Sequence, residues 1–292
     1  MSKLKAKDPK TTEPSKPKML ISGPPGVGKT WFALEFPSVY MIDAEGGANL
    51  SHYTDRLKKS GGVYMGPDDG ALESETIIEQ FKALSTEKHD HKTVVVDSIS
   101  KVFNTLIAQE QERLGDKDAF GASKKPAVAF MRRLVMWADR LDMNVLFIAH
   151  ETAEWGLDSK GDRTQIGVTA DVWNKLAYEL HLWLQASKRG PKREVTVRKS
   201  RLTGFPDADV MPLDYKEFAE RYGKDVINKA ATQIVLASSE QVAEIKQLLE
   251  VVKIAEEDIT KWFTKASVDR FDDMTTEQIS KCITFLKGKV KQ

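Results

Sequence analysis

The chain has 292 residues, of which 41% are hydrophobic and 30% are charged, and its formal net charge is +1. This length accommodates one domain of about 200 residues and a smaller one. No apolar run approaches the roughly 18 residues of a membrane span, which argues against a membrane protein, and the near-neutral charge gives no global signal for a nucleic-acid partner. The single cysteine, Cys282, excludes an intramolecular disulfide and a cysteine-rich zinc site, in agreement with a cytoplasmic location.

Residues 1–17 are expected to form a disordered tail, because they are rich in Lys, Pro, Thr and Ser and lack the apolar stretch of a secretory signal. Short apolar runs then predict buried strands at Met19–Ser22, Val39–Ile42, Thr93–Val96 and Val145–Ala149. Helical spacing of apolar residues predicts helices at Thr30–Phe36, Ser74–Leu84, Ser100–Leu114 and Val128–Leu141. Buried strands that alternate with helices are typical of an α/β fold with a mainly parallel central sheet, covered on both faces.

The pattern of apolar residues changes near residue 180. Leucines occupy alternate positions at 180–184 and valines do so at 195 and 197, on either side of the turn Arg189-Gly190-Pro191. This alternation predicts a β-hairpin that extends the sheet.

A separate helical unit is predicted at 238–292, where no strand-like run occurs. Ser238 with Gln241 and Thr275 with Gln278 match the capping box that opens a helix. The expected core of this unit consists of Leu248, Leu249, Val252, Trp262, Phe263, Ile279, Ile283 and Leu286. The chain is therefore expected to contain an α/β domain at 18–235 and a small all-α domain at 238–292.

The segment Gly23-Pro-Pro-Gly-Val-Gly-Lys29-Thr30 matches the P-loop pattern, and it joins a predicted strand to a predicted helix as that pattern requires. In such a loop, backbone N–H groups and the helix N-terminus surround phosphate oxygens. Lys29 is predicted to contact the β and γ phosphates, and Thr30 to bind Mg²⁺. ATP and Mg²⁺ are the expected ligands, and the expected ATP-binding residues are Gly23, Pro24, Pro25, Gly26, Val27, Gly28, Lys29, Thr30 and Trp31.

Two acidic residues follow predicted strands and complete the candidate site. Asp97 ends a buried run and is the second expected magnesium ligand. Many P-loop ATPases place a glutamate directly after this aspartate to orient the attacking water, but Ser98 occupies that position here. We assign the role to Glu45, which lies just past another strand. The alternative is that Asp43 and Glu45 cap a helix that starts near Asn49.

The segments Ile42-Asp-Ala-Glu45 and Val94-Val-Val-Asp97-Ser98 resemble corresponding segments of the RecA family. The resemblance covers about residues 18–215 and implies a RecA-like P-loop NTPase core. In that family the next strand ends in a polar residue, usually glutamine, which contacts the γ phosphate and leads into a DNA-binding loop. Here His150 occupies that position, and an imidazole N–H can donate the same bond. His150 is therefore the expected γ-phosphate sensor; a strand-end histidine satisfied by backbone groups is the alternative.

The segment from Val197 to Pro206 resembles the one by which a RecA subunit reaches into the ATP site of its neighbour. Lys199 and Arg201 match the two basic positions. The resemblance implies that they assist catalysis in trans, which would couple hydrolysis to assembly into a filament or a ring. A solvated basic strand end is the alternative.

The sequence is most similar to phage-encoded RecA-like ATPases of the single-strand annealing (Sak-type) group. The similarity lies in the combination of Asp-Ala-Glu, Val-Asp-Ser and the strand-end pair His150-Glu151. This resemblance implies a slow, DNA-stimulated ATPase that acts in phage homologous recombination, by annealing or strand exchange, in the cytoplasm of the bacterial host. Single-stranded DNA and further copies of the chain are the implied partners, and a single-strand binding protein is another candidate.

RecA-like proteins bind single strands through two loops, and the candidates here are Gly115–Pro126 and Glu151–Gly167. Aromatic side chains near cations allow base stacking and phosphate contacts. The expected DNA-binding residues are Phe120, Lys124 and Lys125 in the first loop and Trp155, Lys160 and Arg163 in the second. Nearby acids dilute the positive charge, and the alternative is two surface loops with one packed tryptophan.

Two rival functions belong to other classes. Pro24-Pro25 in the P-loop is common in AAA-type remodelling and clamp-loading ATPases. Ser98 argues against that class, because its members place a glutamate there, and so does the hairpin predicted after Ala186, where they have a helical lid. The third hypothesis is an ATP-gated adaptor whose C-terminal helices recruit a replication protein.

Overall fold

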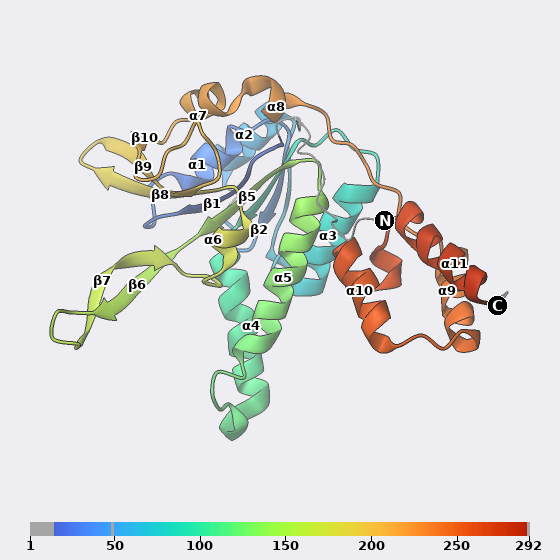
Figure 1. Ribbon diagram of the computed structural model, residues 1–292. Coiled ribbons are helices and arrows are strands. Elements are labelled where there is room, and N and C mark those ends of the chain that lie inside the picture. The colour runs from blue at the N-terminus through green and yellow to red at the C-terminus, as the bar shows by residue number, and fades with distance from the viewer. Residues whose placement is uncertain (1–14, 48–49, 291–292) are drawn as a thin grey trace.

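The computed structural model describes residues 15–47 and 50–290, which form an α/β core and a helical C-terminal region (Figure 1). An eight-stranded sheet lies in the core, in the order β10-β9-β8-β1-β5-β4-β2-β3. Its strands are β1 (Lys18–Ser22), β2 (Val39–Asp43), β3 (Val63–Met65), β4 (Thr93–Asp97), β5 (Asn144–Ala149), β8 (Leu182–Arg189), β9 (Lys192–Ser200) and β10 (Val210–Pro212). The six strands from β8 to β3 are parallel. β9 pairs antiparallel with β8, and β10 pairs antiparallel with β9. The predicted fold class is confirmed.

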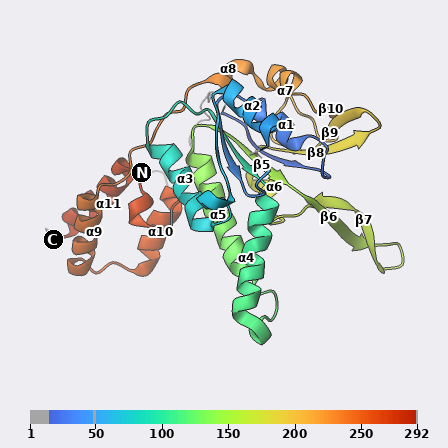
Figure 2. The same cartoon turned by 180° about the vertical axis from the view of Figure 1, so that it is seen from behind.

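Helices cover both faces of the sheet, as the views from the front and from behind show (Figure 2). One face packs against α1 (Lys29–Leu34), α2 (Ser51–Ser60), α7 (Tyr215–Tyr222) and α8 (Lys224–Asn228). The other face packs against α3 (Ser74–Thr86), α4 (Ile99–Leu114), α5 (Lys124–Arg140) and α6 (Leu176–Glu179). Short 3₁₀ turns lie at Pro67–Asp69, Gly115–Lys117 and Phe271–Asp273. Within the described ranges, no helix has the length and apolarity needed to cross a bilayer.

The apolar runs in the sequence reflect burial on both sides of the sheet. In β1, Met19 and Ile21 join the cluster beneath α1, while Leu20 joins the cluster beneath α5. All residues of β4 and β5 are buried. A strand in this position requires apolar residues at successive positions, because neither face reaches water.

The second predicted DNA-binding loop, Glu151–Gly167, is not a loop. It forms most of a protruding antiparallel hairpin made of β6 (Glu151–Leu157) and β7 (Arg163–Ala170). Its residues include many with high strand propensity, such as Thr, Trp, Ile and Val. Asp158 closes the turn, because its carboxylate accepts hydrogen bonds from the backbone N–H groups of Lys160 and Asp162. The loop prediction followed from the resemblance to the RecA family and overlooked this strand pattern.

The first predicted loop, Gly115–Pro126, is only partly irregular. It begins with a 3₁₀ turn and ends inside α5, so that Lys124 and Lys125 belong to the first helical turn. The helix therefore starts four residues before its predicted start at Val128. Pro126 is compatible with this position, because the first turn of a helix does not need its N–H group.

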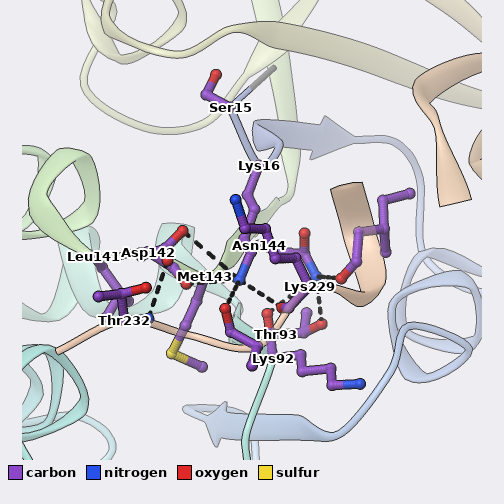
Figure 3. A network of polar contacts seen from close by, with 12 residues as sticks. Ser15, Lys16, Lys92, Thr93, Leu141, Asp142, Met143, Asn144, Lys229 and Thr232 are labelled. Carbon is purple, nitrogen blue, oxygen red and sulfur yellow. Dashed lines mark hydrogen bonds and ion pairs between the residues drawn. The ribbon is translucent and has the colours of Figure 1, made fainter. Parts of the chain in front are cut away.

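Residues 16 and 17, which the sequence analysis assigns to the tail, are buried. The ammonium group of Lys16 donates hydrogen bonds to the carbonyl oxygens of Asp142, Lys229 and Ala230, at 2.8, 2.7 and 3.1 Å. These contacts join the start of β1 to the α5–β5 connection and to the segment after α8 (Figure 3). The tail prediction therefore does not hold for these two residues, and residues 1–14 lie outside the described part of the chain.

Asn144 makes a second set of contacts at the same end of the sheet (Figure 3). Its amide nitrogen lies 3.0 Å from three acceptors, which are the carbonyl oxygens of Lys92 and Ile227 and the hydroxyl of Thr93. These contacts hold the segment that leads from the core to the C-terminal helices at the end of the sheet opposite the P-loop.

The C-terminal region contains α9 (Ser239–Val251), α10 (Glu256–Ala266) and α11 (Thr276–Val290), which pack around an apolar cluster of their own. Both predicted capping boxes are present, at Ser238 and at Thr275. Of the expected core, Ile279, Ile283 and Leu286 are buried and the other five are partly buried. A 2.9 Å ion pair between Lys82 of α3 and the buried Asp273 connects this region to the core. The domain limits 18–235 and 238–292 remain a proposal.

Candidate functional site

A cavity of about 680 Å³ lies at the carboxyl ends of β1, β4 and β5. Its lining residues come from the P-loop and α1, from the carboxyl ends of β2, β4 and β5, and from α2, β9 and the segment after β10: Pro25, Gly26, Gly28, Lys29, Thr30, Trp31, Phe32, Glu35, Glu45, Tyr53, Asp97, His150, Arg193, Leu213 and Asp214. The structure therefore brings together the predicted lysine, magnesium ligands, catalytic acid and phosphate sensor. A larger cavity of about 950 Å³ between α5 and α10 contains none of these residues.

The P-loop bends tightly between β1 and α1, and two of its glycines are required by their surroundings. A Cβ atom at Gly23 would lie 2.8 Å from the carbonyl oxygen of Ala186, which no side chain tolerates. Gly28 precedes α1 with φ of 108°, a left-handed conformation that side chains disfavour. Val27 points into the core. The predicted ATP-binding segment thus divides into residues that line the cavity and residues, including Gly23 and Val27, that shape the loop.

Lys29 is a buried cation of the P-loop. Its ammonium group donates to the carbonyl oxygens of Gly23 and Pro24, at 2.6 and 3.0 Å. Burial lowers the pKa of Lys29, and the nearby carboxylates of Asp97, Glu151 and Glu45 oppose this shift. The lysine therefore sits in an environment that favours an additional negative partner.

Thr30 and Asp97 contact each other, as two ligands of one ion would. The hydroxyl of Thr30 donates to Oδ2 of Asp97 at 2.6 Å. These hard oxygen donors suit Mg²⁺, which commonly combines one or two protein oxygens with phosphate and water. No group of three His, Cys, Asp or Glu side chains in the described residues could hold a metal ion by itself. A magnesium ion held by Thr30 and Asp97 would take its remaining ligands from the nucleotide and from water.

The carboxyl group of Asp97 is costly to ionise without a cation. Burial raises its pKa from 3.8 to about 6, and the charges of Glu45 and Asp43 act in the same direction, against the hydrogen bond from Thr30 and the charge of Lys29. Between these two pH values the folded chain binds more protons than the unfolded chain. Stability should consequently fall as pH rises from 3.8 to about 6.

Asp97→Asn should therefore stabilise the nucleotide-free protein against unfolding by about 1–3 kcal/mol at pH 7.5. The amide removes the buried charge and can still accept the hydrogen bond from Thr30. Thermal unfolding of both proteins at pH 5 and pH 7.5 measures this effect, and the difference should be smaller at pH 5. A variant that is less stable than wild type at both pH values would contradict this account of Asp97.

Glu45 and His150 form a pair that the sequence did not reveal. Nε2 of His150 lies 2.5 Å from Oε1 of Glu45, and both side chains are partly exposed to the cavity. The backbone N–H of His150 donates to the hydroxyl of Ser100, which fixes the end of β5. Asp43 accepts from the N–H groups of Glu45 and Gly46, so it holds this turn rather than a helix end. The alternative helix start at Asn49 lies outside the described residues.

Sequence reasoning missed the cavity residues that come from later segments. Tyr53 lies on α2, Arg193 near the start of β9, and Leu213 just after β10. The side chains of Arg193 and Leu213 pack against the P-loop, because each would lie within 3.5 Å of a Cβ atom at Gly28. No local motif marks these residues. Trp31 also lines the cavity, and the guanidinium carbon of Arg56 lies 3.6 Å from the centre of its ring.

Lys199 and Arg201 do not line the cavity of their own chain. β9 runs away from the P-loop, and its end brings Lys199 opposite Trp183, near the start of β8. Lys199 donates to the carbonyl oxygen of Leu180, and Arg201 to that of Tyr178. A role in the site of a neighbouring copy remains a prediction.

The predicted DNA-binding residues lie on two separate projections. Phe120 is fully exposed near Lys124 and Lys125, at the tip of the α4–α5 pair. Trp155 is 53% exposed on the β6–β7 hairpin, and the guanidinium carbon of Arg163 lies 5.0 Å from its ring centre. Lys160 lies at the hairpin turn. The tip of the α4–α5 pair and the turn of the β6–β7 hairpin lie apart from each other, as Figures 1 and 2 show.

This sheet and site define a P-loop ATPase domain of the RecA-like kind: β5 separates the P-loop strand from the strand that ends in Asp97, and Asp97 touches Thr30. A model of the AAA domain family matches residues 15–203, and the chain belongs to that family. No curated protein gave a match.

Two solved structures are similar in part. The RadB recombinase has 18% sequence identity and a TM-score of 0.43, over 66% of this chain and 84% of that one. A type III secretion system ATPase of pathogenic bacteria has 12% identity and a TM-score of 0.38, over 92% of this chain and 81% of that one.

Proposed function

We propose that the chain binds ATP with Mg²⁺ in the P-loop cavity and hydrolyses it. The observation that carries this proposal is the convergence of Lys29, Thr30, Glu45 and Asp97 on one cavity from separate segments. Lys29 would exchange its two carbonyl acceptors for β and γ phosphate oxygens. Bound magnesium would neutralise charge on the transferring phosphoryl group.

The Glu45–His150 pair gives each residue a role in hydrolysis. His150 can donate to a γ-phosphate oxygen, and this releases the carboxylate of Glu45 to accept a proton from the attacking water. The two side chains contact each other at 2.5 Å. Binding of a triphosphate would replace this contact by one between His150 and the γ phosphate.

We further propose that the ATPase acts on single-stranded DNA in phage homologous recombination, by annealing or strand exchange. The exposed Trp155 with its neighbouring Arg163 supports this, because base stacking on an aromatic ring near a cation is tolerant of sequence. Phe120, Lys124 and Lys125 offer a second contact. Assembly into a filament or ring would let both projections follow one strand, and would place Lys199 and Arg201 of one copy at the next copy's ATP. A single-strand binding protein is a further proposed partner, and the bacterial host cytoplasm the proposed location.

Trp155→Ala should weaken binding of a fluorescent single-stranded oligonucleotide by about fivefold to a hundredfold, since one stacked base contributes about 1–3 kcal/mol. Anisotropy measurements with and without a non-hydrolysable ATP analogue test this. Phe285→Ala on α11, which removes an exposed aromatic ring elsewhere, is the matched control and should leave binding unchanged. If the wild-type chain shows no salt-sensitive binding in any nucleotide state, the DNA proposal is wrong.

A remodelling or clamp-loading ATPase is the second candidate, and the AAA domain match favours it. Against it, Ser98 follows Asp97, and the chain after Ala186 completes the β8–β9 hairpin instead of a helical lid. An ATP-gated adaptor is the third candidate, with α9–α11 as the recruiting surface. ATP turnover that is slow and unaffected by DNA, with nucleotide binding retained, would favour the adaptor.

A further inference from the structure

Arg193 is a second cation in the wall of the P-loop cavity, and the proposed hydrolysis does not use it. It lies on β9, where Val195 and Val197 pack into the apolar cluster beneath α1. Because successive side chains of a strand point to opposite faces, Arg193 lies on the same face as these valines. Its carbonyl oxygen accepts a 3.0 Å hydrogen bond from the N–H of Leu213, which anchors this end of β9. The sheet therefore directs the side chain of Arg193 toward the P-loop.

The side chain of Arg193 packs directly against the P-loop. A Cβ atom at Gly28 would lie 3.4 Å from Cδ of Arg193 and 3.7 Å from its Nε. The guanidinium group thus lies beside the residue that precedes α1. Lys29 and Arg193 are the two lysine or arginine residues in the cavity lining, which also contains four carboxylates. These carboxylates repel a bound polyphosphate, so a second cation offsets a repulsion that Lys29 would otherwise meet alone.

The tip of the β8–β9 hairpin carries four cations at directly opposed positions. Lys188 lies opposite Arg193, and Arg189 lies opposite Lys192. All four residues are exposed, and in the part of the chain that the structure describes none of their side chains forms an ion pair or a hydrogen bond. Like charges at directly opposed positions destabilise a pair of strands. An anion bound by Arg193 would reduce this repulsion, so the hairpin itself favours a negatively charged ligand.

The order of the strands decides which phosphates Arg193 can reach. Glu45, Asp97 and His150 follow β2, β4 and β5, which lie on one side of β1. They carry the proposed contacts to magnesium, the attacking water and the γ phosphate. Arg193 comes from β9, on the other side of β1. Its guanidinium group therefore lies on the side away from the γ phosphate, next to the phosphates that ADP and ATP share.

We infer that Arg193 binds the α and β phosphates of the nucleotide in its own subunit and acts on ADP and ATP alike. The inference rests on the proposed nucleotide binding and adds a second cation to the same site. A guanidinium group presents planar pairs of N–H donors that match phosphate oxygens. It does not contact the γ phosphate, so it sets the affinity for nucleotide and leaves the chemical step unchanged.

Arg193→Met tests the contact, because methionine keeps an unbranched stem that can pack against Gly28 but removes the charge. Isothermal titration should show that the affinities for ADP and for a non-hydrolysable ATP analogue both fall by about tenfold to a hundredfold. Arg193→Lys keeps the charge and should lose less affinity than Arg193→Met for both ligands. Thermal unfolding should show no loss of stability in Arg193→Met, since the substitution relieves the repulsion with Lys188.

Arg189→Met is the matched control, because it removes the same charge from the same hairpin at a residue that does not line the cavity. It should change both affinities by less than about twofold, since solvent and salt screen a charge without direct contact. If Arg189→Met loses as much affinity as Arg193→Met, the hairpin attracts nucleotide only through its net charge, and the assigned contact is wrong.

Inorganic triphosphate separates a phosphate contact from a contact with the ribose or the base, because it has neither. In competition with a fluorescent ATP analogue, Arg193→Met should weaken triphosphate binding by the same factor as ATP-analogue binding. Unchanged triphosphate affinity would place Arg193 at the ribose or the base and overturn the assignment to phosphate. Turnover at saturating ATP should equal that of wild type, and a fall of at least about a hundredfold would mean that Arg193 acts on the γ phosphate instead.

The same titrations distinguish failure of this inference from failure of the proposed function. If the wild-type chain binds neither nucleotide, the proposed function and this inference are both wrong. If the wild-type chain binds both nucleotides and a folded Arg193→Met variant binds them with equal affinity, this inference alone is wrong.

Discussion

Lys29→Ala should weaken ATP binding by at least about a hundredfold. The ammonium group is buried, and its pKa is lowered by burial, so the nucleotide-free site holds this charge at a cost. Charge-assisted hydrogen bonds to phosphate oxygens offset that cost, and each contributes about 1.5–3 kcal/mol. Removing the ammonium group leaves the triphosphate without the cation of the P-loop. Titration with a fluorescent ATP analogue measures the loss.

The control for Lys29→Ala is Lys246→Ala, which removes an exposed lysine from α9, far from the cavity. This variant should bind ATP as the wild type does. Thermal unfolding of both variants checks that the P-loop variant remains folded. Wild-type affinity in a folded Lys29→Ala protein would mean that the triphosphate does not bind at the P-loop.

Glu45→Gln should retain ATP binding and lower turnover by at least about a hundredfold, because a positioned general base contributes about 10²–10⁴-fold. Glutamine keeps the size of the side chain and can still contact His150, but it cannot accept a proton from water. Steady-state phosphate release and titration with a non-hydrolysable analogue separate turnover from binding.

Glu79→Gln on the exposed side of α3 is the matched control for the loss of one carboxylate, and its turnover should equal that of wild type. Equal turnover in wild type and Glu45→Gln would mean that Glu45 has a structural role and is not the general base. It would also make Glu151 the acid to examine next, since it is the remaining carboxylate near Lys29 that does not bind the proposed magnesium ion.

The sequence predicted the parts of the site that depend on local chemistry. The glycines, the lysine and the threonine of the P-loop have a fixed spacing in the sequence. The position of the loop between an apolar run and a helix can be predicted without tertiary information. Asp97 and Glu45 were predicted because each follows a buried strand, and parallel strands place their carboxyl ends at one edge of the sheet. His150 was predicted because the resemblance to the RecA family implies a γ-phosphate sensor at its position. The structure places all three in one cavity with Lys29.

The remaining parts of the site depend on distant segments and could not be predicted. Arg193 and Leu213 reach the P-loop only because β8, β9 and β10 extend the sheet beside β1. The contact between Glu45 and His150 joins residues 105 positions apart, and no pattern within either segment indicates it. The hydrogen bond from Nε2 of Gln185 to the carboxylate of Glu151 also joins distant residues, 34 positions apart, and could not be predicted either.

The sheet was predicted where strands are buried and missed where they are exposed. β3 has only three residues, and Val63 and Tyr64 are exposed at the sheet edge, so its apolar run is too short to predict a strand. The β6–β7 hairpin stands away from the core and has no buried face to impose a clear alternation of apolar and polar residues. Exposed strands carry the weakest signal in a sequence, and here they include the element proposed to bind DNA.

Isothermal titration of the wild-type chain with a non-hydrolysable ATP analogue, with magnesium and then with a chelator, tests most directly whether Lys29, Glu45 and Asp97 surround a magnesium-bound triphosphate. We expect one binding site per chain, an affinity that falls at least about tenfold when magnesium is removed, and a similar loss in Asp97→Asn. Absence of binding, or an affinity that neither the chelator nor Asp97→Asn changes, would contradict the assignment of this cavity.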